Sequence, residues 1–307
     1  MPRSGTNYLM DLLCCHPDVA PGRFPVKEDL FLEQSDHLIR FVTNVRSSWD
    51  PTWGEFPHDL EADLLGAIGD GLISFLWTDK RRRLLTKSPS VRNIQRFHQL
   101  FPEAKLLILI RDGRSIVQSC VDTFGWDFDT AAYRFSDAAN ELLEWLSSGG
   151  QTSSNLVVRY EELVNDMKPT MMHVLDFVGL SPESFDFSAA DALPVRGSSS
   201  HRGEGRSAVH WDPVPKDASF WPLERWSSWD PAKLARFEWI AGGESRALGY
   251  DTGRGEISSP TAQRMRDLRW HSIRWGRRAV YRIRGKLGPP TRPIRNRLAA
   301  LIRNRDR

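Results

Sequence analysis

The stretch KLLILIRDGRSIVQS, residues 105–119, decides the fold class of this chain. The unbroken apolar run at 106–110 predicts a strand that is buried on both faces, which is typical of a parallel sheet. Asp112 and Gly113 form a turn, and the apolar residues Ile116 and Val117 then open a helix. A buried strand that leads through a tight turn into a helix is the building unit of α/β proteins.

Strand and helix patterns alternate on both sides of this stretch. Residues 84–89 and 156–160 read as strands, and residues 24–31 read as a strand entering a loop. Helices are expected at 5–15, 58–80, 91–101, 130–147 and 231–247, and another should contain Pro169 near its start and end at Gly179. The alternation predicts an α/β fold with a doubly wound parallel sheet flanked by helices.

The chain opens on PRSGTNYL, residues 2–9, a glycine-containing turn that leads into an amphipathic helix. Such a turn points backbone N–H groups and the positive end of a helix dipole at an anion. It lacks the Gly-Lys-Ser/Thr ending of nucleoside triphosphate loops, which disfavours a P-loop kinase. Because a loop of this kind normally follows a buried strand, we expect the natural protein to begin upstream of Met1. A structure starting at Met1 should then have an unfilled strand position.

Charge divides the chain into two parts. Residues 253–307 contain 16 Lys and Arg but 3 Asp and Glu, so residues 1–252 hold the other 26 basic and 36 acidic residues. This asymmetry predicts an acidic α/β domain over 1–252 and a basic amphipathic tail over 253–307. No apolar run of about 18 residues exists, so no transmembrane helix is expected.

The basic tail has apolar residues among its arginines, which predicts amphipathic helices. Helices of this type often lie on anionic membranes, so such a surface is one candidate partner. The alternatives are that the tail folds against the acidic body or is solvated. No nucleic-acid partner is expected, because no DNA-reading motif accompanies the charge. The three cysteines form no disulfide framework, which favours a cytoplasmic location. The basic tail would add peripheral association with a membrane.

Taken together, the motifs of this chain resemble those of the sulfotransferase family. Residues 2–6 are similar to the loop that binds the 5′-phosphosulfate of 3′-phosphoadenosine-5′-phosphosulfate (PAPS), and residues 111–119 resemble the family's 3′-phosphate motif. Further matches follow in the family's order at 16–19, 87–89, 101–105 and 160–163. The resemblance covers about residues 2–250. It implies a P-loop NTPase-like sulfotransferase fold from which the first strand is missing.

The resemblance also implies PAPS as the cofactor, without a metal ion. Arg111 stands at the carboxyl end of the best strand, where open α/β sheets bind ligands, and Ser119 follows on the next helix. These two residues should hold the 3′-phosphate. Tyr160 is expected beside the adenine, or else as a core tyrosine. The predicted cofactor-binding residues are Arg3, Ser4, Gly5, Thr6, Asn7, Arg111, Ser119, Tyr160 and Arg202.

The predicted catalytic residues are Glu28, Lys87 and Arg3. Lys87 and Arg3 match positions suited to stabilising charge that develops on the bridging oxygen. Pro89 stands where the aryl and steroid branch has its catalytic histidine, so that base is absent. Residues 27–31 instead resemble the Lys-Glu-x-x-Phe pattern of the branch that acts on carbohydrates and on tyrosine, which makes Glu28 the expected base.

The sequence leaves alternatives for the base and for the acceptor. Glu28 is alternatively a surface or ion-paired carboxylate, with Asp29 and Glu33 as reserve bases. We expect a PAPS-dependent sulfotransferase acting on a hydroxyl of a small molecule, with a carbohydrate or glycolipid acceptor favoured. The alternative is an inactive or truncated sulfotransferase-like scaffold that binds a membrane or a partner through its tail.

Overall fold

The computed structural model describes residues 1–24, 27–55, 59–80, 82–150, 152–198, 213–216, 220–253, 259–268 and 270–272. The chain divides into two compact units, Met1–Gly255 and Glu256–Arg307. In the second unit, residues 260–268 are helical, and the side chains of Met265 and Leu268 are exposed. Most of the predicted basic tail lies outside the described residues, so its contact with a membrane stays a prediction.

The strands of the first unit form two parallel pairs. β1 (Val19–Pro21) pairs with β2 (Arg83–Leu85), and β3 (Leu106–Ile110) pairs with β4 (Asn155–Arg159). The register places Leu106 opposite Asn155 and Ile110 opposite Arg159. The α/β class with parallel strands is confirmed. Among the described residues, however, the strands form two separate pairs where we expected one continuous sheet.

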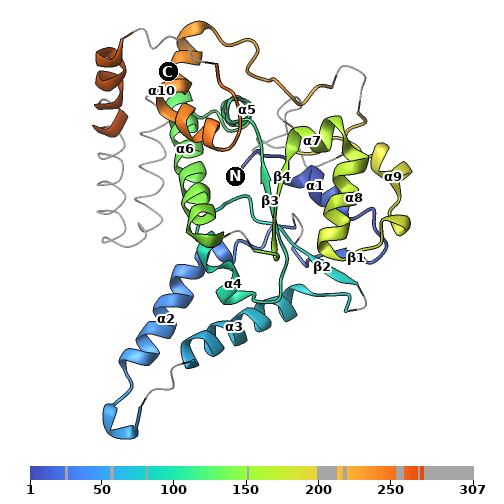
Figure 1. Ribbon diagram of the computed structural model, residues 1–307, viewed down its shortest axis with the longest axis vertical. Helices are drawn as coiled ribbons and strands as arrows, with labels where there is room; N and C mark the ends of the chain where they lie inside the picture. Colours follow the sequence, from blue (N-terminus) through green and yellow to red (C-terminus); the bar gives the residue numbers. More distant parts are fainter. Residues whose placement is uncertain are drawn as a thin grey trace, which may run out of the picture. The chain divides into compact units, whose positions relative to one another are not determined.

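Helices cover β3 and β4 on both sides (Figure 1). The two core clusters centre on Val117, Leu142 and Phe237 on one side, and on Leu12, Leu163 and Leu175 on the other. The first cluster joins α5 (Gly113–Phe124), α6 (Phe128–Trp145) and α10 (Pro231–Ala247). The second joins α1 (Thr6–Leu13), α7 (Tyr160–Asn165), α8 (Met167–Val178) and α9 (Phe187–Asp191).

Two helices, α2 (Ser35–Ser47) and α3 (Leu60–Leu76), lie side by side and project from the strands (Figure 1). α3 matches the helix expected at 58–80, whereas α2 was not predicted. Ser35 and Val42 of α2 are buried, and Leu38 and Ile39 pack beside Val42 in a small cluster with Leu65 of α3. α3 packs on α4 (Phe97–Leu100) through Gly69, where an added Cβ would lie 1.6 Å from the Leu100 carbonyl oxygen.

Several element boundaries differ from those expected. No strand forms among the described residues of 24–31, where Glu28 makes an isolated β-bridge to Lys87. The nearby strand is β1 at Val19–Pro21, which was not predicted. The helix expected at 91–101 is reduced to the turn η3 (Ile94–Arg96) and α4. The remaining short elements are η1 (Leu32–Gln34), η2 (Pro51–Trp53), η4 (Leu146–Gly150) and η5 (Pro182–Ser184).

The α-amino end of Met1 is buried. The residue is 5% exposed and belongs to the cluster that contains Val91, Ile94 and Ile108. Burial removes water from the amino group and lowers its pKa from 8.0 to about 6. The protonated form of this group is therefore disfavoured in the folded chain.

We expect the free energy of unfolding of the 307-residue chain to rise between pH 6 and pH 8. Over this range the unfolded chain keeps a proton on its amino group that the folded chain has released, so stability increases with pH. A shift of this size corresponds to ~2–3 kcal/mol. Urea unfolding across the range measures it. N-terminally acetylated protein, which has no titrating amine, is the control and should lack this increment; equal profiles for both samples would contradict the expectation.

Candidate active site

The turn at residues 2–5 requires glycine at its last position. Gly5 has φ of 101° and stands directly before α1. An added Cβ there would lie 2.3 Å from the ring of Tyr160. The first N–H groups of a helix have no partner within it, and the predicted phosphate binding by Thr6 and Asn7 depends on this property. That binding stays a prediction.

Replacing Gly5 with alanine should lower the free energy of unfolding by about 2–5 kcal/mol, because backbone strain adds to overpacking against Tyr160. Thermal unfolding measures this. Gly54→Ala is a matched control, since Gly54 also has a positive φ, of 111°, but an added Cβ would meet nothing within 4 Å. Equal losses of unfolding free energy in the two variants would contradict a destabilising contact between the added methyl group and Tyr160.

Ser4 closes the turn from within. Its side chain is fully buried, and its hydroxyl donates to the Met1 carbonyl at 2.8 Å. This hydroxyl is therefore engaged inside the turn, whereas we predicted a place for Ser4 among the phosphate ligands. Its neighbours Gly5, Thr6 and Asn7 line the adjoining cavity.

Arg111 is the buried cation of the site, at the carboxyl end of β3. Its side chain donates to the Arg3 carbonyl at 3.0 Å and to the Pro222 carbonyl. The guanidinium lies 4.4 Å from the centre of the Tyr160 ring. Its Nε is buried without a hydrogen-bond partner among the described residues. A buried N–H with no acceptor is a place where an anionic ligand is accommodated.

Arg3 and Ser119 join Arg111 in one cluster. Arg3 Nε donates to Ser119 Oγ at 3.0 Å, although 116 positions separate the two residues. Burial, with repulsion from Arg111 as a smaller cause, lowers the pKa of Arg3 to about 10. The side chain still carries its charge at neutral pH. The structure therefore brings together three residues that we predicted for the cofactor.

The turn after β3 is fixed by its own contacts. Asp112 caps α5 by accepting from the Arg114 N–H at 2.8 Å, and it pairs with the Arg114 guanidinium at 2.7 Å. The Asp112 N–H donates to Glu161 at 3.0 Å. Gly113 packs so closely that an added Cβ would lie 2.3 Å from the Phe135 ring. These contacts set the direction of the preceding Arg111.

Lys87 and Glu28 form an ion pair with N and O atoms 2.5 Å apart. Backbone bonds of the bridge align the two segments, since the Lys87 N–H donates to the Lys27 carbonyl at 3.2 Å. Burial lowers the pKa of Lys87, while the hydrogen bond that Lys87 donates to the Glu28 carboxylate opposes this shift. The predicted base is thus ion-paired, with the predicted catalytic lysine as its partner. This contact agrees with the alternative reading of Glu28 as an ion-paired carboxylate, and its role as the base stays a prediction.

The reserve bases are placed differently. Asp29 accepts from the Thr86 hydroxyl at 2.6 Å and from the Phe31 N–H at 2.8 Å, so its carboxylate is used within the loop. Glu33 is half-buried in η1 and lines neither described cavity. Glu28 is the member of this group that lines the cavity of the arginine cluster.

Tyr160 forms part of the floor of the site. It is 7% exposed at the start of α7, where its ring meets Gly5, Arg111 and the edge of Tyr8. Its ring thus supports the turn and the arginine, a role closer to the core tyrosine we considered as the alternative. Contact with an adenine stays a prediction.

Arg225 is a cation of the site that we did not predict. It lines the same cavity and donates to Ser198 Oγ at 3.0 Å. Burial and then repulsion from Arg111 lower the pKa of Arg225. Its segment carries no recognisable motif, so only the long-range fold places it here. Arg202, our sequence-based choice for a second 3′-phosphate contact, lies outside the described residues.

These residues surround a cavity of about 690 Å³. Arg3, Arg111 and Arg225 supply positive charge, and Glu28 lines the same cavity. The cavity volume, the arginines and the glycine turn fit a nucleotide with several phosphate groups. Among the described residues, no cluster of three His, Cys, Asp or Glu is arranged to hold a metal ion. No helix of the described part is long and apolar enough to cross a bilayer.

Similar proteins point to one family. The chain is 25% identical over 300 residues to protein-tyrosine sulfotransferase A of Caenorhabditis elegans, covering 91% of this chain and 74% of that protein. It is 25% identical over 267 residues to protein-tyrosine sulfotransferase 2 of Gallus gallus, covering 82% and 68%. These relatives agree with the predicted tyrosylprotein-type branch.

A solved structure shares the fold. It is the sulfotransferase domain of the Synechococcus PCC 7002 olefin synthase, with a TM-score of 0.50, 19% sequence identity, and coverage of 81% of this chain and 92% of that domain. Residues 1–184, more than half of the chain, match the family model described as "Sulfotransferase family". The predicted resemblance is confirmed, and the chain belongs to the sulfotransferase family of PAPS-dependent transferases.

Proposed function

We propose that this protein transfers a sulfuryl group from PAPS to the phenolic hydroxyl of a tyrosine in a protein. The observation that carries the proposal is the convergence of Arg3, Arg111 and Ser119 in one cavity that Glu28 also lines. A cluster of buried guanidinium groups suits a multiply charged phosphate ligand. A carboxylate in the same cavity suits an acceptor that must lose a proton.

Residues of the turn and of the arginine cluster would hold PAPS. The N–H groups at the start of α1 would hold the 5′-phosphosulfate, together with Arg3. Arg111 and Ser119 would hold the 3′-phosphate, and Arg225 would add a further cation. When bound, PAPS supplies the sulfuryl group and a phosphate leaving group. The protein contributes position and positive charge, which sulfuryl transfer requires as phosphoryl transfer does.

Glu28 and Lys87 would act on the acceptor side of the reaction. Glu28 accepts the proton of the tyrosine hydroxyl on its carboxylate, which makes the oxygen a better nucleophile. The Lys87 ammonium lies against this carboxylate before the reaction and stabilises negative charge nearby. Because Lys87 is 8% exposed and Glu28 is 21% exposed, bulk water screens the pair only in part.

The relatives favour an acceptor different from the carbohydrate or glycolipid expected at first. The matched proteins from Caenorhabditis elegans and Gallus gallus are both protein-tyrosine sulfotransferases. Their names support a tyrosine hydroxyl as the acceptor of this chain. A site for a carbohydrate has no corresponding support.

A transfer assay tests the proposal. Protein is incubated with PAPS and a tyrosine-containing peptide, and mass spectrometry locates the sulfate. Matched peptides with phenylalanine or serine at the same position, and an oligosaccharide, are the controls. Sulfate found on the tyrosine supports the proposal. Transfer to the serine peptide or the oligosaccharide, with none to tyrosine, would overturn it.

We also retain the membrane role of the tail and a cytoplasmic location as proposals. The charge of residues 253–307 supports the first of them. Co-sedimentation with anionic vesicles, with and without residues 253–307, tests it. Equal binding by both forms would overturn the role of the tail.

A further inference from the structure

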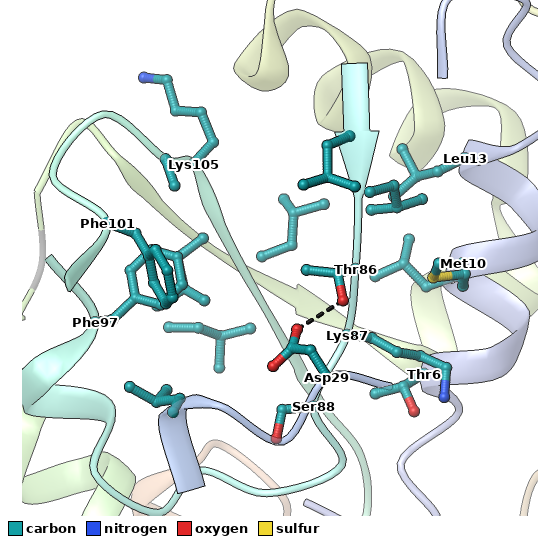
Figure 2. Close-up of a pocket in the computed structure, with 18 of the residues that line it drawn as sticks. Thr6, Met10, Leu13, Asp29, Thr86, Lys87, Ser88, Phe97, Phe101 and Lys105 are labelled. Atoms are coloured by element: carbon teal, nitrogen blue, oxygen red, sulfur yellow. Dashed lines mark hydrogen bonds between the residues drawn. The ribbon is translucent and has the colours of Figure 1, made fainter. Parts of the chain in front are cut away.

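Thr86 and Lys87 each hold one residue of the loop that contains Glu28. The Thr86 hydroxyl donates to the Asp29 carboxylate at 2.6 Å, and Lys87 forms the ion pair with Glu28. Figure 2 shows the Thr86 and Asp29 side chains pointing toward each other, while the Lys87 side chain points away from them. Two adjacent residues that follow β2 thus hold two adjacent residues of the loop, in the register of the Glu28–Lys87 bridge.

Glu28 and Asp29 line different cavities. Glu28 lines the cavity of the arginine cluster, whereas Asp29 and Thr86 line a second cavity, of about 590 Å³, whose walls are mainly apolar (Figure 2). Successive side chains of an extended segment point to opposite sides, which explains this division. The contact between Asp29 and Thr86 therefore lies on the side of the loop away from the arginine cluster, and it acts on Glu28 through the backbone.

The loop that carries the predicted base contains two strained backbone positions. Lys27 has φ of 59° and Leu30 has φ of 56°, values that residues with a side chain rarely adopt. Strain of this kind persists only where surrounding contacts hold the backbone in place. Asp29 supplies such contacts with both of its carboxylate oxygens, since one accepts from the Phe31 N–H at 2.8 Å and the other accepts from Thr86.

We propose that the contact between Asp29 and Thr86 is a latch that positions the Glu28 carboxylate for proton abstraction. The proposal rests on the proposed function, in which Glu28 is the base. The Asp29 N–H donates to the Lys87 carbonyl at 3.3 Å, and the Lys87 N–H donates to the Lys27 carbonyl at 3.2 Å, so the latch adjoins the backbone bonds of the bridge. Loss of the latch lets the strained loop relax and moves the carboxylate away from the acceptor hydroxyl. Asp29 and Thr86 are thus positioning residues.

Thr86→Val tests the latch, because valine keeps the shape of threonine but has no hydroxyl. We expect kcat for sulfuryl transfer to fall by about 10–100-fold. Hydrogen exchange of the Lys87 amide should accelerate by about tenfold. Thr86→Ala is the second variant if valine prevents folding, and Thr86→Ser, which keeps the donor, should restore most of kcat. In the control Thr170→Val, the lost hydroxyl donates to the Asp166 carbonyl at 2.8 Å in α8, and neither quantity should change.

The double variant Glu28→Gln/Thr86→Val shows whether the latch acts through the base. Once residue 28 is glutamine, Thr86→Val should lower kcat no further, because the two losses have one cause. Losses that multiply would overturn the proposal. They would indicate a general structural effect of Thr86, or Asp29 itself as the base.

The exchange measurement separates failure of the latch from failure of the proposed function. If the wild-type protein transfers no sulfate to tyrosine, the proposed function fails, but exchange of the Lys87 amide still reports whether the latch holds the bridge. Unchanged exchange in folded Thr86→Val and Thr86→Ala would overturn the latch. Faster exchange with an unchanged kcat would overturn its role in positioning Glu28.

Discussion

Replacing Glu28 with glutamine should lower kcat for sulfuryl transfer by about 10²–10⁴-fold. Glutamine keeps the size of the side chain but cannot accept the proton of the acceptor hydroxyl. It also removes the negative charge that pairs with Lys87 at 2.5 Å. Because Glu28 is not among the residues proposed to hold the phosphates, the Kd for 3′,5′-adenosine bisphosphate should stay within about twofold of the wild-type value. Steady-state kinetics and calorimetry on the same samples measure both quantities.

Glu33→Gln is the matched control for this variant. Glu33 is also a glutamate, five positions along the chain, and its side chain is half-buried. It does not line the cavity of the arginine cluster or the second, apolar cavity. Its replacement should leave kcat near the wild-type value. If Glu28→Gln also keeps kcat near wild type in a folded protein, Glu28 is not the base. Its contact with Lys87 is then purely structural.

Replacing Arg111 with alanine should weaken binding of 3′,5′-adenosine bisphosphate by about 10²–10³-fold. Two charge-assisted hydrogen bonds to a phosphate, at the lower end of the range, about 1.5–2 kcal/mol each, account for a loss of this size. The buried Arg111 Nε has no hydrogen-bond partner among the described residues, which suits this guanidinium to an anion. Calorimetric titration measures the change in Kd.

Two further variants control this experiment. Arg111→Lys keeps the positive charge but loses the planar guanidinium that can donate two parallel hydrogen bonds. Its Kd should therefore lie between those of the wild type and Arg111→Ala. Arg92→Ala also removes a guanidinium, but from an exposed ion pair with Asp36, and should bind like the wild type. Since Arg111 also holds the Arg3 and Pro222 carbonyls, Tm must be compared for each variant. An unchanged Kd in folded Arg111→Ala would contradict the assignment.

Local signals made the centre of the fold predictable. The apolar run 106–110 is β3, the following helix is capped by Asp112, and Gly179 ends α8 with φ of 68°. Each of these features depends on neighbouring residues, which is why the sequence alone indicates them. The turn at residues 2–5 is a similar case, since its glycine and the following helix are adjacent in the chain.

The features that sequence reasoning missed depend on contacts between distant segments. α2 is an exception, because Leu38, Val42 and Val45 recur at helical spacing and could have identified it from the sequence. Arg225 lies at the site because its segment contacts Arg111. The Arg111 side chain donates to the carbonyl of Pro222, three positions before Arg225. The pairing of Glu28 with Lys87 likewise depends on a bridge across 59 positions. No local pattern encodes these approaches.

Calorimetric titration of the wild-type protein with 3′,5′-adenosine bisphosphate tests the central claim most directly, namely that the arginine cavity is a nucleotide site. We predict saturable binding at one site per chain, weakened about 10²–10³-fold in Arg111→Ala and unchanged in Arg92→Ala. Absence of binding by wild-type protein that unfolds cooperatively would contradict the claim.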